Sequence, residues 1–270
     1  MKFTKMQGLG NDFIVASDLS GKLKLTTAQV ERLCDRRFGI GADGLMLIRT
    51  PADPQQADFS WWFANADGSF PEMCGNGSRC FARYVVEEGL IPSGCKEVRL
   101  ETLAGIKTIR IRSHADGSFA AATVDMGIVK VEDEPVHLLG HDFARVSVGN
   151  PHAVAFMDAL PMEFNTAPVI DLGPQVEIDP VFPNKTNVEF VHPISMSQIE
   201  MRVWERGVGE TLACATGAVA GAVASYVRGS SAPEVSVRLP GGSLDVSITP
   251  EFRVLMTGPA ERVFDGMIDR

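Results

Sequence analysis

Two short segments of the sequence resemble each other around a cysteine. The first is Met73-Cys74-Gly75-Asn76-Gly77 and the second, 140 residues later, is Ala213-Cys214-Ala215-Thr216-Gly217. A thiol has an ordinary pKa of about 8.5, so it can take up or release a proton near neutral pH. Taken alone, a cysteine is more often a small buried hydrophobic residue. Two cysteines at matching positions instead indicate acid–base chemistry.

The other three cysteines, Cys34, Cys80 and Cys95, fit no such pattern. No Cys-x-x-Cys pair occurs among the five, so we predict that the chain has no metal site. The start of the chain lacks the apolar core of a secretory signal, so we do not expect a disulfide framework. We interpret these three cysteines as structural.

Each paired cysteine stands just before a predicted helix, over residues 76–88 in the first case and 216–228 in the second. The second helix is apolar on nearly all sides, which is typical of a buried helix. A helix start presents N–H groups that have no intrahelical partner, together with the positive end of the helix dipole. Both stabilise a thiolate, and the same N–H groups can bind a carboxylate.

Most of the remaining sequence alternates between apolar and polar residues, which predicts short β-strands. One further helix is predicted over residues 28–37, where Thr26 and Gln29 resemble a capping box. The pattern favours a sheet wrapped around a central helix. The clearest predicted strands cover residues 2–7, 12–17, 98–101, 106–112, 234–239 and 243–248.

Other landmarks repeat at nearly the same spacing. Gly10-Asn11-Asp12-Phe13 matches Gly149-Asn150-Pro151-His152, and Asn65 and Glu205 each stand nine residues before their own cysteine. Landmarks that recur in the same order at one offset indicate an internal duplication.

The duplication predicts an α/β (α+β) fold of two pseudo-symmetric domains, each a β-barrel-like sheet around a central buried helix. We place the first domain at residues 1–116 and the second at residues 117–257. The C-terminal strand, within residues 258–270, is expected to return to the first domain.

Pseudo-twofold packing would point both helix starts at one cleft, with a sulfur on each side of a bound carboxylate. One thiolate would remove the proton from the carbon next to the carboxylate, and the opposite thiol would protonate its other face. N–H donors of both helices would hold the charge that develops on the carboxylate. Cys74 and Cys214 therefore predict inversion at such a carbon, by a racemase or epimerase.

The repeat also places His152, Glu205 and Arg206 near this site. A lone histidine is more often structural, but here we predict that His152 adjusts the protonation of the thiols. The adjacent charges of Glu205 and Arg206 could form a surface ion pair. Their spacing from Cys214 instead favours contact with a substrate, through Glu205 to an ammonium group and through Arg206 to a carboxylate.

The charge and the apolar runs exclude several classes of partner. The chain has 270 residues and a net charge of −9, whereas nucleic-acid and anionic-membrane surfaces require clustered Lys and Arg. The longest apolar run, residues 217–227, is too short to span a bilayer. We expect a cytoplasmic protein that acts on a small molecule and binds neither nucleic acid nor membrane.

These segments resemble the diaminopimelate epimerase family over the whole chain. The resemblance is carried by residues 5–13, 65–68, 73–80, 149–152, 205–207, 209–211 and 256–260. It implies a cytoplasmic isomerase, usually a homodimer, that needs no pyridoxal phosphate, metal or other cofactor. The implied reaction interconverts LL- and meso-diaminopimelate in the synthesis of lysine and peptidoglycan precursors.

The resemblance also implies roles for individual residues. Cys74 and Cys214 match the acid/base pair, while His152 and Glu205 match positions that adjust the thiol pKa values. The two helix starts would bind the reacting carboxylate, and other polar residues would hold the rest of the substrate. The implied substrate-binding residues are Asn11, Asn65, Gly75, Asn76, Asn150, Asn187, Glu205, Arg206, Ala215 and Thr216.

Two positions depart from the family pattern. Ala215 stands where a glycine often follows the second cysteine, which keeps the N–H donor but adds a methyl group beside the carboxylate. Gly44 stands where some members carry a glutamine that reaches the substrate, so this side-chain contact is not expected here. Both departures concern the substrate pocket and leave the thiols unchanged.

Three alternatives fit part of the same pattern. A racemase of the same architecture could act on proline, hydroxyproline or another amino acid, but Arg206 and the matched asparagines favour a substrate with a second polar end. A redox or ligand-binding protein could instead use Cys74 and Cys214 as a switchable disulfide. An inactive relative is the third alternative, and the presence of both cysteines argues against it.

Overall fold

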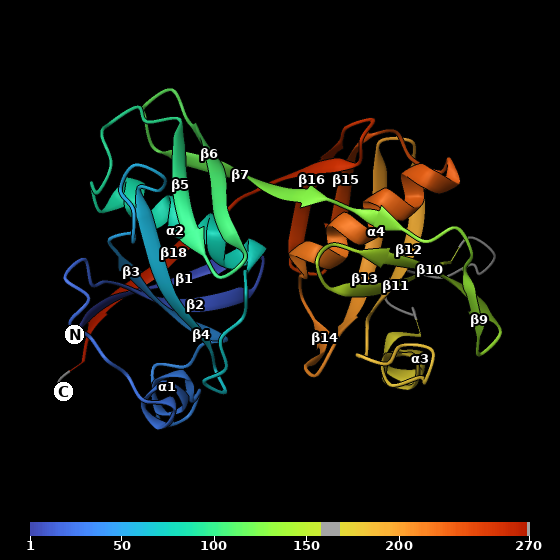
Figure 1. Cartoon of the computed structure of the whole chain (residues 1–270), viewed down its shortest axis with the longest axis horizontal. Helices are drawn as coiled ribbons and strands as arrows, with labels where there is room; N and C mark the ends of the chain where they lie inside the picture. Colours follow the sequence, from blue (N-terminus) through green and yellow to red (C-terminus); the bar gives the residue numbers. More distant parts are fainter. Residues whose placement is uncertain (158–167, 269–270) are drawn as a thin grey trace. The chain divides into compact units, whose positions relative to one another are not determined.

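The computed structural model describes residues 1–157 and 168–268. The chain divides into two compact units, Met1–Val124 with Gly258–Arg270 and Asp125–Thr257 (Figure 1). Strands dominate both units, so the predicted α/β class is confirmed. None of the helices in the described ranges has the length and apolar character of a membrane span.

The first unit contains eight strands, counting the shared strand β7, and two helices. They are β1 (Lys2–Gly8), β2 (Asn11–Ser17), α1 (Thr27–Cys34), β3 (Gly44–Arg49), β4 (Phe59–Asn65), α2 (Gly75–Glu87), β5 (Glu97–Thr102), β6 (Gly105–Ser113), the first part of β7 (Phe119–Ile128) and β18 (Glu261–Met267). Strand β2 pairs parallel to β3 across α1, and β4 pairs parallel to β5 across α2. Antiparallel pairs β1–β2, β3–β4 and β5–β6 connect these steps.

The second unit repeats this order of elements. They are β8 (Lys130–Val131), β9 (Val136–Leu138), β10 (His141–Ser147), β11 (Pro151–Phe156), α3 (Val169–Glu177), β12 (Asn187–Ser195), β13 (Gln198–Glu205), β14 (Gly209–Thr211), α4 (Ala215–Arg228), β15 (Glu234–Leu239), β16 (Gly242–Ile248) and β17 (Arg253–Gly258). Strand β11 pairs parallel to β12 across α3, and β13 pairs parallel to β15 across α4. The matching topology supports the internal duplication read from the sequence.

Helices α2 and α4 are the buried helices of their units. Helix α2 packs against β1, β2 and β6, and α4 packs against the strands from β10 to β13 and β15 to β16. Helix α4 is buried from Ala215 to Ser225 apart from Thr216, because alanine, glycine and valine let the surrounding strands approach closely. Both helices were predicted from the sequence to within one residue at each end.

Helix α1 is shorter than predicted. The capping box of Thr26 and Gln29 is present, and Val30 and Cys34 face the core. The helix ends at Cys34 rather than at residue 37 because the Asp35 carboxylate accepts the backbone N–H groups of Arg37 and Phe38, both at 2.7 Å. A side chain that bonds the backbone locally in this way favours a turn over a helix.

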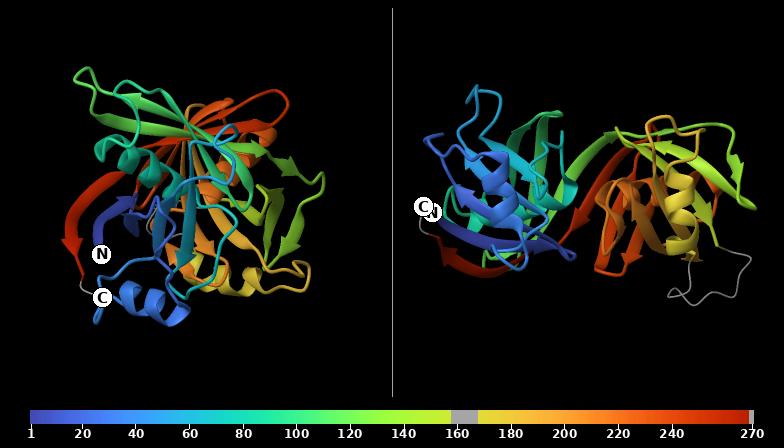
Figure 2. Two further views of the ribbon diagram at one scale, coloured as in Figure 1. Left: turned by 60° about the vertical axis from the view of Figure 1, so that its left-hand side comes forward. Right: turned by 90° about the horizontal axis from the view of Figure 1, so that it is seen from below.

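Strand β7 carries the chain from the first unit into the second. Its first part pairs with β6 as far as Val124, and it also pairs with β17. The units therefore divide after Val124 rather than after residue 116, where the sequence suggested a boundary. Strand β18 pairs with β1 of the first unit, and Figure 2 shows it in red alongside β1 in blue.

Candidate active site

Cys74 and Cys214 occupy the same position in their units. Each is the N-cap residue of the buried helix, with extended backbone, and each sulfur accepts the N–H of the glycine three residues later. The N···S distance is 3.3 Å in both, to Gly77 in α2 and to Gly217 in α4. The first-turn N–H groups of both helices are therefore directed past a sulfur, where an anion can bind.

Cys214 is nearly fully buried, and this outweighs the influence of the helix start. Burial raises the pKa of its thiol well above the ordinary value, and the charges of Glu205 and Glu189 raise it further. Hydrogen bonds from Thr216 and the Gly217 N–H act in the opposite direction. The net shift of the Cys214 pKa is therefore upward, although the Gly217 N–H at the helix start lowers it.

Glu205 is at the end of β13, next to Cys214. Its carboxylate accepts a hydrogen bond from the Thr211 hydroxyl at 2.5 Å. Burial raises the pKa of Glu205, hydrogen bonds from Thr211 and Cys214 lower it, and the net shift is upward. The sequence spacing predicted this proximity of Glu205 to the sulfur.

Cys74 lies beside the asparagines predicted for the first unit. The Asn76 amide donates to Asn11 Oδ1 at 3.1 Å, and the Asn11 amide donates to Asp43 at 2.8 Å. Asn65, the last residue of β4, instead donates to the Ser69 hydroxyl within its own turn.

The second unit has the equivalent contact and extends it. The Asn150 amide donates to the Thr216 hydroxyl at 3.3 Å, and Asn150 Oδ1 lies 3.0 Å from His152 Nε2. The other ring nitrogen, Nδ1, is 2.7 Å from a carboxylate oxygen of Glu189. The structure thus places His152 in the surroundings of Cys214, as predicted, together with a glutamate that the sequence analysis did not identify.

Asn187 and Arg206 are joined by a hydrogen bond. Asn187 Oδ1 accepts the Arg206 backbone N–H at 2.9 Å, and Asn187 Nδ2 donates to the Pro151 backbone carbonyl at 2.9 Å. The Arg206 guanidinium donates to the Asn184 carbonyl at 3.1 Å and is otherwise exposed. Asn187 thereby fixes the backbone from which the Arg206 side chain extends.

Gly44 has no space for a longer side chain. A Cβ atom there would lie 2.8 Å from the Ala64 carbonyl oxygen and 3.1 Å from the Phe63 ring. A glutamine at this position would therefore require the neighbouring strand β4 to move. Ala215, the other departure, is the first residue of α4 and is buried.

None of the remaining three cysteines is the N-cap of a described helix. None of the five cysteines forms a disulfide. Burial raises the pKa of Cys34 to about 11 and that of Cys80 to about 12, so both stay protonated at neutral pH. The half-buried Cys95 donates to the Glu97 carbonyl. Within the described ranges, no three His, Cys, Asp or Glu side chains are grouped so that they could hold a metal ion.

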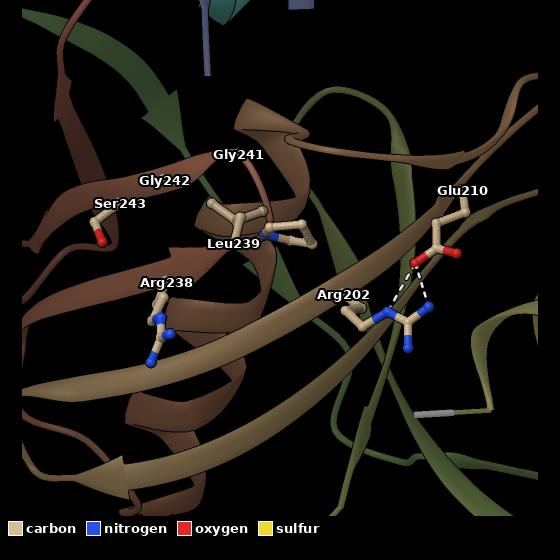
Figure 3. Close-up of a pocket in the computed structure, with 8 residues that line it drawn as sticks. Arg202, Glu210, Arg238, Leu239, Gly241, Gly242 and Ser243 are labelled. Carbon is tan, nitrogen blue, oxygen red and sulfur yellow. Dashed lines mark hydrogen bonds and ion pairs between the residues drawn. The ribbon is translucent and has the colours of Figure 1, made fainter. Parts of the chain in front are cut away.

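A surface pocket in the second unit lies apart from the predicted site residues, between β13, β14 and the β15–β16 turn. Figure 3 shows Arg202 and Glu210 paired with each other on one side of it, and their nitrogen and oxygen atoms are 2.6 Å apart. Arg238, also on its wall, pairs with Glu200 at 2.6 Å. Because these charges are already neutralised within the protein, we assign the pocket no ligand.

Comparison with known proteins gives one consistent family. The family model described as "Diaminopimelate epimerase" matches residues 3–132 and 144–263. A diaminopimelate epimerase of Heliobacterium modesticaldum is 43% identical over 98% of this chain and 99% of the relative. One of Moorella thermoacetica is 44% identical over 98% of each chain, and one of Thioalkalivibrio sulfidiphilus is 42% identical over 100% of this chain and 99% of the relative.

Solved structures share the fold at low sequence identity. A probable proline racemase of Agrobacterium radiobacter superposes with a TM-score of 0.74 at 16% identity, covering 99% of this chain and 92% of that chain. A PhzF-family phenazine biosynthesis protein of Bacillus anthracis gives a TM-score of 0.74 at 16% identity, covering 99% of both. Since one fold hosts different chemistries, these likenesses show the architecture alone.

Proposed function

We propose that this chain, which belongs to the diaminopimelate epimerase family, interconverts LL- and meso-diaminopimelate by proton transfer between Cα and two thiols. The family assignment makes the chain an isomerase that acts in lysine biosynthesis. The observation that carries the proposed mechanism is the matched pair of cysteines. Each caps a buried helix, and each sulfur accepts a glycine N–H at 3.3 Å.

In this mechanism one sulfur is a thiolate and the other a thiol when the substrate binds. The thiolate removes the α-proton, the electron pair of the C–H bond passes toward the carboxylate, and the opposite thiol then protonates the other face of Cα. Each turnover exchanges the protonation states of the two sulfurs. The first-turn N–H groups at Gly75, Asn76, Ala215 and Thr216 stabilise the carboxylate charge.

The other predicted residues hold the substrate and adjust the thiols. Asn11, Asn65, Asn150 and Asn187 would contact its polar groups, Arg206 its distal carboxylate and Glu205 an ammonium group. His152 and Glu205 would also adjust the pKa of the thiols, and the short contacts around Cys214 support this part of the proposal.

We also infer a homodimer in the cytoplasm. The reaction requires both sulfurs as thiol or thiolate, and the cytoplasm is the compartment that keeps them reduced. Val263 and Met267 on β18 are 56% and 80% exposed. Burial of such apolar side chains on a sheet edge would favour association of two copies.

Solvent-deuterium incorporation tests the substrate. Reduced protein in heavy water is given LL-diaminopimelate, lysine, glutamate or proline separately, and deuterium at Cα is measured by mass spectrometry. We expect incorporation only with diaminopimelate, because only this substrate has a second amino-acid end to be held. Exchange with proline or glutamate but not with diaminopimelate would overturn the assignment.

Single cysteine variants test the two-base mechanism. Cys74→Ala and Cys214→Ala should each lower epimerisation by at least about a hundredfold, because each removes one proton carrier. Cys95→Ala is the matched control, since Cys95 is half-buried and only caps a carbonyl, and it should keep full activity. Full turnover by either of the first two variants would exclude the mechanism.

A further inference from the structure

A buried pair of ionisable side chains, His152 and Glu189, lies beside Cys214. Both side chains are 0% exposed, and His152 Nδ1 is 2.7 Å from Glu189 Oε1. The second carboxylate oxygen, Oε2, has no hydrogen-bond partner among the described residues. Burial of a carboxylate costs desolvation free energy, and one incompletely hydrogen-bonded pair offsets this cost poorly. The equivalent position in the first unit holds an apolar residue.

Glu189 corresponds to Met46 of the first unit. Both occupy the third position of a strand, β12 and β3, that runs parallel to its neighbour across a helix. Both also pack on the glycine that donates to the catalytic sulfur. A Cβ atom at Gly77 would lie 3.5 Å from Met46 Cε, and one at Gly217 would lie 2.8 Å from Glu189 Oε1.

The histidine has an apolar counterpart as well. His152 corresponds to Phe13 in the repeated Gly-Asn segment, and both are buried. The first unit therefore builds this strand pair with Phe13 and Met46, whereas the second builds it with His152 and Glu189. Since the same topology forms with an apolar pair, the fold itself does not require the ionisable one.

A continuous series of contacts connects this pair with the sulfur. His152 Nε2 is 3.0 Å from Asn150 Oδ1, and Asn150 Nδ2 is 3.3 Å from the Thr216 hydroxyl. The Thr216 hydroxyl is 3.5 Å from Cys214 Sγ. Glu189 stands at the far end of this series and has no direct hydrogen bond to the sulfur among those the structure gives.

We propose that Glu189 is a positioning residue for the reaction, holding His152 by Nδ1 so that Nε2 acts through Asn150 and Thr216 on Cys214. The Glu189 carboxylate and Asn150 Oδ1 only accept hydrogen bonds, so His152 makes both contacts when it donates from Nδ1 and from Nε2; Glu189 thus holds the ring with an N–H directed at Asn150. Gly217 is required to make room for the carboxylate, since any side chain there would collide with Oε1. The tests of this proposal that measure turnover rest on the proposed function.

A double-mutant cycle tests it. Glu189→Gln keeps the shape of the side chain, and kcat should fall at least about tenfold while KM stays within about twofold. In a His152→Gln background the same substitution should have no further effect, because the two residues act as one unit. Additive losses, or full kcat in Glu189→Gln, would overturn the proposal. Glu200→Gln, which removes an ion pair with Arg238 in the same unit, is the control and should keep kcat.

A stability measurement separates positioning from a purely structural role. The double variant His152→Phe with Glu189→Met copies the pair of the first unit and should unfold at or above the wild-type Tm. His152→Phe alone leaves the carboxylate buried without its partner and should lower Tm by several degrees. A double variant that fails to fold would show that the pair is structural and would refute the proposal.

A readout without substrate distinguishes failure of this inference from failure of the proposed function. The rate of Cys214 alkylation by iodoacetamide, followed by peptide mass spectrometry, should change at least about threefold in Glu189→Gln and not change further in the His152→Gln background. The Cys74 rate should stay constant. An equal change in both backgrounds would mean that Glu189 acts on the sulfur directly and not through His152. Wild-type protein inactive on diaminopimelate would count against the proposed function, while the alkylation cycle would still decide the role of Glu189.

Discussion

Cys74 and Cys214 accept the same glycine hydrogen bond but have different charged neighbours. Arg79, fully buried in α2, interacts electrostatically with Cys74 and donates to the Pro259 carbonyl at 2.9 Å. Around Cys214 the carboxylates of Glu205 and Glu189 are buried together with His152, and burial and the carboxylate charges raise the pKa of the thiol. A nearby cation favours a thiolate and nearby anions favour a thiol. The two sulfurs therefore differ in their charged neighbours: a guanidinium is among those of Cys74, whereas two carboxylates raise the pKa of Cys214.

The effect of Glu205 on Cys214 can be measured directly. Glu205→Gln removes a negative charge that raises the pKa of Cys214, so this pKa should fall. Below that pKa the thiolate fraction rises about tenfold for each unit of the fall. Alkylation of Cys214 by iodoacetamide at pH 8 should therefore be faster in the variant.

The same experiment provides its own references. The Cys74 rate should not change, and Glu210→Gln, which breaks an ion pair with Arg202, should leave the Cys214 rate at its wild-type value. An unchanged or slower Cys214 rate in Glu205→Gln would contradict the electrostatic account.

At the scale of elements, the two helix starts differ in how much space surrounds their third residue. A Cβ at Gly77 would meet Cys74 and Met46 at 3.4 to 3.5 Å, which is ordinary contact. A Cβ at Gly217 would lie 2.8 Å from Glu189 and 3.2 Å from the Cys214 Cβ. The two positions of the repeat therefore form a matched pair for mutation.

Gly77→Ala should be tolerated, with Tm unchanged or slightly raised because alanine favours a helix. Gly217→Ala should displace the Glu189 carboxylate or the helix start, at a cost of about 1–3 kcal/mol for overpacking. It should also lower kcat by about tenfold or more, since the sulfur and its partners move. Calorimetry and steady-state kinetics measure both effects. Equal behaviour of the two variants would mean that the space around Gly217 is not limiting.

The sequence predicted the elements whose signals are local. Helix α4 follows from its apolar pattern, α2 from the cysteine segment that repeats before α4, and α1 from the capping box at Thr26. Helix α3 was not predicted, because Gly173 and Pro174 disfavour a helix. It forms because Gly173 packs closely on Trp204. A Cβ atom added at Gly173 would lie only 2.6 Å from the Trp204 Cβ. Such a helix depends on a tertiary contact, which cannot be predicted from local helix propensity.

The site was predictable as far as the repeat extends. Cys74, Cys214, His152 and Glu205 were found because their segments recur at one offset. Glu189 was not found, because a charged residue between two apolar ones in a strand is usually on the solvent side. Strand β12 is buried on both faces over its first half, so its glutamate faces the core.

At the scale of the whole molecule, the first unit is closed by a strand from the far end of the chain. Strand β18 pairs with β1 from Lys2 to Gln7, and the rings of Phe3 and Phe264 pack edge to face. The same segment supplies carbonyl acceptors for Arg79 and Arg83, at Pro259 and Ala260.

Deletion of residues 259–270 should therefore unfold the first unit. It removes β18, one of the two strands paired with β1, and the Pro259 carbonyl that accepts from the buried Arg79, a loss that costs about 1–3 kcal/mol for the one group. We expect a fall in Tm of at least about 10 °C and loss of amide protection in β1, measured by calorimetry and hydrogen exchange. Native protection of β1 in the shortened chain would contradict this account.

The pairing of β1 with β18 also has a consequence for the order of folding during synthesis. Residues 125–257 form one continuous unit and can complete their sheet as soon as they leave the ribosome. The first unit appears earlier, but β1 has to wait for a partner that is translated after the entire second unit. Until then β1 keeps an unpaired edge, the kind of surface that promotes aggregation in nascent chains. The unit that begins the chain is thus the last to be completed.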